Sequence, residues 1–152
     1  MKVFFTFLAL LTVCLSLICF TADMDRYEQL QLHLKAVAEE CAGGSVLFTD
    51  PEYYAGGLVV FREDYARDYV DFLLDEARES YASFRNGNIS AEIILFDDEK
   101  GYSGINEYGI KQQKPCGVVT LTWTGTDIFR LPFLEMTCVS RTAVYEWEEQ
   151  GF

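Results

Sequence analysis

The sequence opens with an unbroken apolar run. None of residues 3–20 is charged, and twelve of these eighteen residues are Val, Leu, Ile or Phe. Eighteen helical residues at ~1.5 Å each reach roughly 27 Å, close to the thickness of a bilayer's hydrocarbon core. The pattern therefore predicts that residues 1–22 form a transmembrane anchor, with residues 3–20 in contact with membrane lipid.

The same helix is predicted to continue beyond the membrane as a stalk over residues 23–44. Neither Pro nor Gly occurs between Phe20 and Gly43, and the stretch is rich in residues that favour helix. Apolar residues recur in it at alternating steps of three and four: Tyr27, Leu30, Leu34, Val37 and Cys41. Two interpretations of this helix face stay open. It is either buried against the chain's own domain or an assembly face for other helices.

Residues 45–152 have the pattern of one small α+β domain. An apolar stripe at helical spacing over residues 63–84 predicts a second, amphipathic helix, and this stripe is expected to pack on a sheet. No helix pattern separates the later strand signals, which favours an antiparallel sheet of three to four strands. A short strand or extended segment is predicted at residues 58–61, strands at residues 90–96, 118–123 and 134–147, and a turn at Asp50-Pro51.

Charge narrows the classes of function. The chain has 24 acidic and 12 basic residues, and the part beyond Lys2 carries 11 basic and 24 acidic residues, about −13. Such a surface repels phosphate backbones, so no nucleic acid is expected as a partner. No nucleophile, phosphate-loop or metal-site motif appears, so we predict no catalytic, cofactor-binding or metal-binding residues and no enzyme. The single His33 is expected to be a solvated helix residue, and residues 97–99 a solvated acidic turn rather than a calcium loop.

The five cysteines lack the dense, even pattern of a disulfide scaffold. Cys14 and Cys19 lie inside the apolar run. Of the remaining three, Cys116 and Cys138 flank two candidate strands, and a disulfide between them across a hairpin is possible. The alternative is that both are free cysteines, which often serve as small buried apolar residues.

The residues that flank the apolar run predict how the chain lies in the membrane. Lys2 and the amino terminus precede the run, whereas Asp23 and Asp25 follow it. We therefore expect a single-pass protein of the cell membrane, with a cytoplasmic N-terminus and an extracytoplasmic C-terminal domain. A cleaved signal peptide is the alternative. A cut after Ala22 would place the bulky Phe20 where a small residue is preferred, and this favours retention of the segment.

Three stretches resemble a known family. The segment DMDRYEQLQLHLKAVAEECAGG, which directly follows the apolar run, is similar to the start of TadE- and TadG-like proteins, the minor pseudopilins of tight adherence (Tad) pilus systems. The stretches YYAGGLVVFREDYARDYVDFLL and PFLEMTCVSRTAVYEWE resemble the amphipathic helix and the closing strand of Gram-positive members. The Gly-Glu cleavage site of pilin-class proteins does not occur between Met1 and Phe20.

This resemblance implies a pilin-like fold and a membrane-held structural subunit that assists assembly of a Tad-type pilus. Its partners would be other pilin-like subunits and the inner-membrane platform proteins of the pilus. Two other classes of function stay open. One is a secreted or surface-anchored ligand-binding domain with a cleaved signal peptide, and the other is an extracytoplasmic enzyme.

Overall fold

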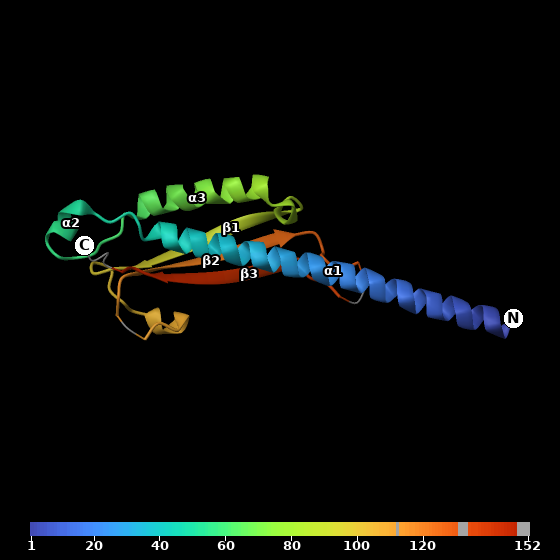
Figure 1. The fold of residues 1–152 in the computed structure, drawn as a ribbon. Helices are drawn as coiled ribbons and strands as arrows, with labels where there is room; N and C mark the ends of the chain where they lie inside the picture. The colour runs from blue at the N-terminus through green and yellow to red at the C-terminus, as the bar shows by residue number, and fades with distance from the viewer. Residues whose placement is uncertain (112, 131–133, 149–152) are drawn as a thin grey trace.

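The computed structural model describes residues 1–111, 113–130 and 134–148, and it confirms the predicted α+β fold. A long N-terminal helix, a second helix and a three-stranded antiparallel sheet form a pilin-like arrangement (Figure 1). In chain order the elements are α1 (Lys2–Ser45), α2 (Pro51–Ala55), α3 (Glu63–Ser80), the 3-10 helix η1 (Ala82–Phe84), β1 (Gly87–Phe96), the 3-10 helix η2 (Ile105–Tyr108), β2 (Cys116–Gly125) and β3 (Cys138–Glu146).

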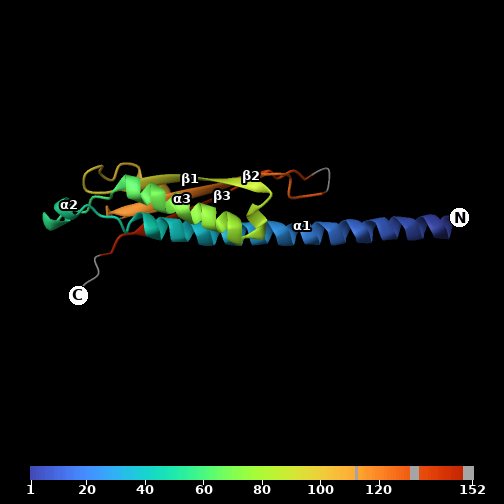
Figure 2. The same ribbon diagram turned by 90° about the horizontal axis from the view of Figure 1, so that it is seen from above.

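Helix α1 runs without a break through the predicted anchor and the predicted stalk (Figure 2). It ends at Ser45, directly after the glycine pair. Gly44 is required by packing, because a Cβ atom there would lie 2.0 Å from the ring of Tyr69 on α3. A Cβ atom on Gly117 of β2 would likewise lie 2.4 Å from Oγ of Ser45. The two glycines therefore allow the end of α1 to pack closely against both α3 and the sheet.

The sheet has the strand order β1-β2-β3, with both pairs antiparallel. Trp123 of β2 lies opposite Ile89 of β1 and Val139 of β3, so the three side chains share one face of the sheet. Helices α1 and α3 cover this face (Figure 1). On the opposite face, the hydroxyls of Thr120 and Thr142 are hydrogen-bonded at 2.9 Å across the β2–β3 pair.

The main core lies between the sheet and the two helices. Its largest buried members include Leu34 of α1, Phe84 of η1 and Leu121 of β2. The full set comprises Leu30, Leu34, Val37, Ala38, Cys41, Ala42, Val70, Leu73, Leu74, Ala77, Phe84, Ile89, Val119, Leu121, Trp123, Val139 and Ala143. The predicted stalk therefore does not stand apart from the domain, because residues 30–42 of α1 form one wall of its core.

Several element boundaries differ from the predicted ones. Asp50 and Pro51 begin the short helix α2, with Oδ1 of Asp50 accepting the backbone N–H of Glu52 at 2.9 Å. The second predicted helix ends at Ser80, and η1 follows it. Strand β3 is shorter than the predicted segment 134–147 and begins only at Cys138.

Of the two interpretations of residues 58–61, the strand is not formed, which leaves the extended segment. Phe61 forms an isolated bridge with Thr49, and carboxylates after the end of β1 accept two backbone N–H groups of the segment. The N–H of Val59 donates to Oδ2 of Asp98 at 2.8 Å, and the N–H of Phe61 donates to Oδ2 of Asp97 at 3.2 Å. Because side chains accept these hydrogen bonds, the segment does not join a strand ladder.

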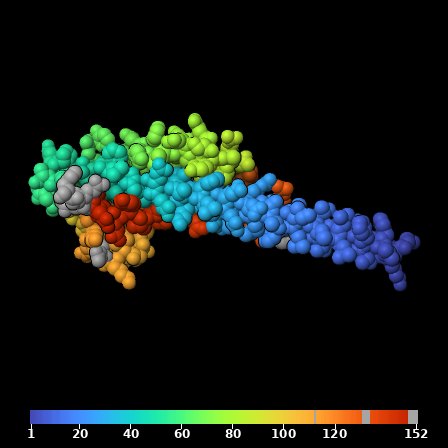
Figure 3. All heavy atoms as spheres, viewed as in Figure 1, coloured from blue at the N-terminus to red at the C-terminus, as the bar shows by residue number. Residues whose placement is uncertain are grey.

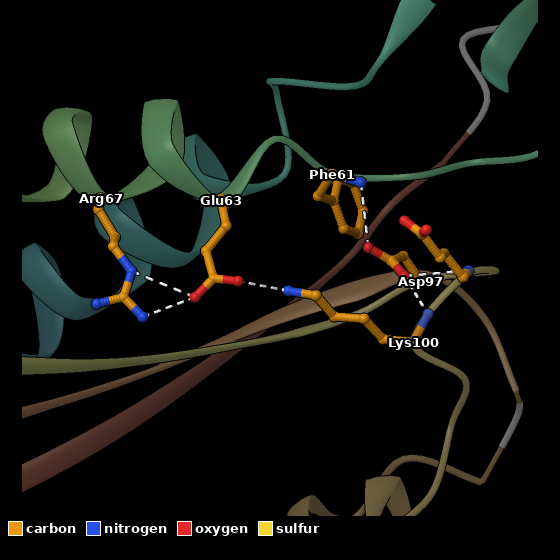
Figure 4. A network of polar contacts seen from close by, with 6 residues as sticks. Phe61, Glu63, Arg67, Asp97 and Lys100 are labelled. Atoms are coloured by element: carbon orange, nitrogen blue, oxygen red, sulfur yellow. Dashed lines mark hydrogen bonds and ion pairs between the residues drawn. The ribbon is translucent and has the colours of Figure 1, made fainter. Parts of the chain in front are cut away.

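Asp97 is fully buried, which corrects the prediction of a solvated acidic turn for this residue, whereas Asp98 and Glu99 are exposed as predicted. Its Oδ1 accepts the backbone N–H groups of Glu99 at 3.1 Å and Lys100 at 2.8 Å, while its Oδ2 accepts that of Phe61 (Figure 4). Three donors satisfy a carboxylate that would otherwise be costly to bury. The turn therefore connects β1 to the segment that leads into α3.

An ion-pair network lies beside this turn (Figure 4). Nζ of Lys100 lies 2.6 Å from Oε2 of Glu63, and Nη2 of Arg67 lies 2.6 Å from Oε1 of the same carboxylate. The hydrogen bonds from Lys100 and then from Arg67 lower the pKa of Glu63 from 4.5 to about 2. The network joins the first turn of α3 to the β1 end at the protein surface.

Candidate functional site: the anchor segment and its junction with the domain

The N-terminal part of α1 projects from the domain as an apolar rod (Figure 3). We call residues 3–20 the anchor segment. No side chain from Lys2 to Phe20 is buried by the remaining described residues. Its exposed large side chains are Val3, Phe4, Phe5, Phe7, Leu8, Leu10, Leu11, Val13, Leu15, Leu17, Ile18 and Phe20. Helix α1 is thus long and apolar enough for a membrane span, and a signal sequence has the same properties.

The polar groups of the anchor segment are compatible with lipid. The hydroxyls of Thr6, Thr12 and Ser16 donate to main-chain carbonyls four residues earlier, at 3.0, 2.9 and 2.9 Å. A backbone that is helical throughout pairs its own N–H and C=O groups, as a membrane span requires. At ~0.3–0.6 kcal/mol for each Val, Leu, Ile or Phe, insertion is favoured by about 4–7 kcal/mol.

A buried carboxylate lies directly after the anchor segment. Asp23 is fully buried, and its Oδ2 accepts the backbone N–H of Arg130 at 2.9 Å. Nε of Arg130 lies 3.3 Å from the other oxygen, Oδ1, which Arg26 approaches only to 3.8 Å. Oδ1 makes no well-directed hydrogen bond with any described residue, so the ion pair with Arg130 is its main compensation. Asp23 thereby fastens the β2–β3 connection to α1.

Aromatic side chains close the same junction. Phe129 is buried, and its ring stacks on Phe20 with centroids 6.3 Å apart. It also packs on Tyr27 at 6.3 Å. The loop after β2 therefore contacts α1 on both sides of Asp23. We call Phe20, Asp23, Tyr27, Phe129 and Arg130 the junction, since they mark where the exposed apolar helix becomes part of the domain.

The helix face proposed for assembly is buried inside the domain. Leu30, Leu34, Val37 and Cys41 belong to the main core, and Tyr27 packs against it. The assembly role predicted for these five residues is therefore corrected: the sheet and α3 already cover this face. The other interpretation, a helix packed on its own domain, describes the structure.

The possible disulfide between Cys116 and Cys138 is not formed. Cys138 lies opposite Thr124 in the β2–β3 register, eight residues along β2 from Cys116. At ~3.4 Å per residue this separates the two by roughly 27 Å, whereas a disulfide needs Cα atoms within about 7 Å. Burial raises the pKa of the Cys116 thiol to about 11 and that of Cys41 to about 12, so both are unreactive at neutral pH.

His33 is not the solvated residue that the sequence predicted. Its Nδ1 lies 2.9 Å from Oγ of Ser83, and its ring stacks on Tyr81 with centroids 4.3 Å apart. These contacts join α1 to the end of α3 and to η1. His33 thus has a packing role within the described fold.

The junction is the feature that sequence reasoning missed. Asp23 is 107 residues from its partner Arg130, so no local pattern connects them. The one available signal was a carboxylate placed directly after an apolar run. Within the described ranges, no group of three or more His, Cys, Asp or Glu side chains is placed to hold a metal ion. Comparison with protein-family models, curated proteins and solved structures found no match to this chain.

Proposed function

We propose that this chain is a membrane-anchored structural subunit of pseudopilin type. Its anchor segment remains in the cell membrane, with the N-terminus in the cytoplasm and the α+β domain outside. The observation that carries the proposal is the division of α1: one continuous helix whose first half is apolar and uncovered, and whose second half builds the domain core. A rigid link of this kind transmits the position of the domain to the membrane helix.

The partners that we propose are other pilin-like subunits and the membrane platform proteins of a Tad-type assembly system. The resemblance of three stretches of the sequence to TadE-like proteins supports this choice. The sheet and α3 cover the apolar face of residues 27–41. We therefore assign the lateral contacts with partner helices to the anchor segment. We assign the chain a structural role and no catalytic one.

Photocrosslinking in native membranes tests the lateral contacts. Leu10 in the anchor segment is 62% exposed and Leu32, beyond the junction, is 65% exposed, so the two positions are matched. A photoreactive amino acid at Leu10 should give adducts with other membrane proteins, whereas one at Leu32 should give few. If Leu10 gave adducts with lipid only, the assembly role of the anchor segment would be wrong.

The second candidate is a secreted ligand-binding domain. Its support is that every buried residue of the described fold lies at Asp23 or later. A chain cut after residue 22 would keep its whole core and would lose the contact of Phe20 with Phe129. The mature N-terminus of the protein from its native host separates the two candidates.

A further inference from the structure

A pocket of about 380 Å³ lies beside the junction, between α1, η1 and the loop after β2. This volume falls within the range of small-ligand sites. The pocket wall combines charged, amide, hydroxyl and indole groups from four separate segments. Those that matter here are Arg26, Gln29, Ser83, Asn86, Trp123 and Asp127.

Two opposite charges line the pocket. Arg26 comes from α1, and its side chain is 59% exposed with only a long 3.8 Å contact to Asp23. Asp127 comes from the β2–β3 loop, and its Oδ1 accepts the backbone N–H groups of Phe129 at 3.1 Å and Met136 at 2.9 Å. A purely anionic ligand would be repelled by Asp127, and a purely cationic one by Arg26. The pair therefore favours a zwitterion.

A buried donor also borders this space. Trp123 is almost fully buried, and its indole Nε1 has no hydrogen-bond partner in the described part of the chain. The Nε1 atom is itself almost inaccessible, so the indole forms a wall of the pocket and a reporter of its occupancy. The amides of Gln29 and Asn86 add further donors for anionic oxygen atoms.

The position of the pocket identifies the source of the ligand. Arg26 lies six residues beyond Phe20, about 9 Å along the helix axis. The headgroup layer of a bilayer begins where the anchor segment ends and is roughly 5–8 Å deep. Long side chains such as that of Arg26 reach back toward such a layer. Phospholipid headgroups therefore lie within reach of the Arg26 side of this pocket if the anchor segment is retained.

We propose that the pocket binds the headgroup of a zwitterionic membrane phospholipid that carries a primary ammonium group, as phosphoethanolamine does. Arg26 and the neighbouring amides contact the phosphate, and Asp127 accepts hydrogen bonds from the ammonium. The lipid acyl chains then lie along the anchor segment. This inference rests on the membrane retention that is part of the proposed function.

The test uses the full-length chain in nanodiscs of phosphatidylglycerol with increasing phosphatidylethanolamine. The chain has two tryptophans, so Trp147→Phe leaves Trp123 as the only indole reporter. We expect a saturable change in Trp123 fluorescence and selective retention of one phosphatidylethanolamine in native mass spectra. Phosphatidylcholine, whose quaternary ammonium has no N–H, should require at least tenfold more lipid for half-saturation.

Matched variants test which side chains bind the lipid headgroup. Arg26→Gln should raise the half-saturating lipid fraction at least tenfold, while Arg85→Gln removes a charge near the same end of the domain without lining the pocket and should change nothing. Asp127→Asn keeps the Oδ1 acceptor for the loop and should abolish the preference over phosphatidylcholine. Wild-type behaviour of both Arg26→Gln and Asp127→Asn would overturn the proposal.

Two further experiments complete the test. The first distinguishes lipid from soluble phosphate compounds, and the second distinguishes failure of the pocket proposal from failure of the anchor proposal. Inorganic phosphate or glycerophosphoethanolamine added to phosphatidylglycerol nanodiscs should leave the fluorescence and the mass spectra unchanged. An equal response to inorganic phosphate would show a site for free phosphate and would overturn the lipid assignment. A chain that resists carbonate extraction but retains no phosphatidylethanolamine would refute the pocket proposal alone. A chain extracted by carbonate would refute the anchor itself.

Discussion

The two halves of α1 are parts of one helix in opposite surroundings. Residues 3–20 are apolar around the whole circumference and touch almost nothing else in the described fold. Residues 23–45 are apolar on one face only, and that face is covered by the sheet and α3. Helix formation is the same in both halves, so the arrangement of apolar residues around the axis decides which half folds with the domain and which is left for lipid.

The largest expected effect tests the difference between the two halves of α1. Leu34→Ala removes a fully buried core side chain and should lower the free energy of unfolding by about 2–5 kcal/mol. Leu10→Ala shortens an exposed side chain in the anchor segment and should leave that free energy unchanged. Denaturant titration of both variants in detergent checks the difference. Equal losses would contradict the division of α1.

The next largest effect is expected from the buried hydrogen bonds of Asp97. Asp97→Asn replaces one acceptor oxygen with an NH2 group, so the side chain can no longer accept from Phe61 and from Glu99 and Lys100 together. We expect a loss of about 2 kcal/mol, typical of a disrupted buried charged hydrogen bond. Asp64→Asn on the exposed surface of α3 is the matched control. A stability of Asp97→Asn equal to that of the control would show that the Asp97 contacts do not stabilise the fold.

A smaller effect is expected at the boundary between the halves. Asp23→Asn removes the charge that pairs with Arg130 but keeps one oxygen that can accept its backbone N–H. The junction should loosen locally, by about 1 kcal/mol, with little change in the core. Hydrogen exchange at the amides of Phe129 and Arg130 should become faster, while Asp25→Asn, an exposed neighbour, should have no effect.

The smallest effect concerns the surface network at the start of α3. Glu63→Gln should cost under about 1 kcal/mol, since the ion pairs are solvent-screened. The pKa of Glu63 is lowered to about 2 by Lys100 and Arg67. Its contribution should therefore be complete above pH 4.5 and disappear as the pH falls toward 2. The difference in unfolding free energy between wild type and variant, measured against pH, should narrow over this window.

The sequence predicted the elements better than their contacts. The three-four spacing of Leu30, Leu34 and Val37 correctly indicated an apolar helix face, but spacing alone does not say whether the cover comes from the same chain or from another. In the same way, residues 58–61 have a strand-like composition, yet their backbone partners are the carboxylates of Asp97 and Asp98. These partners lie more than thirty residues away, beyond any local pattern.

The strand register also determines how far apart the two cysteines lie. Cys116 and Cys138 both flank strands of the hairpin, as predicted, but the antiparallel pairing puts them at opposite ends of it. The connection between Asp23 and Arg130 depends on the same register, because it brings the β2–β3 loop to the base of the domain. Neither relation is encoded in the spacing of neighbouring residues.

The most direct test of the account is the fate of residues 1–22 in the native host. Intact mass and carbonate extraction are measured together on the same membrane preparation. The account predicts a full-length chain that stays in the membrane at high pH. A soluble product that begins near Asp23 would contradict the anchored subunit and would favour the secreted binding domain.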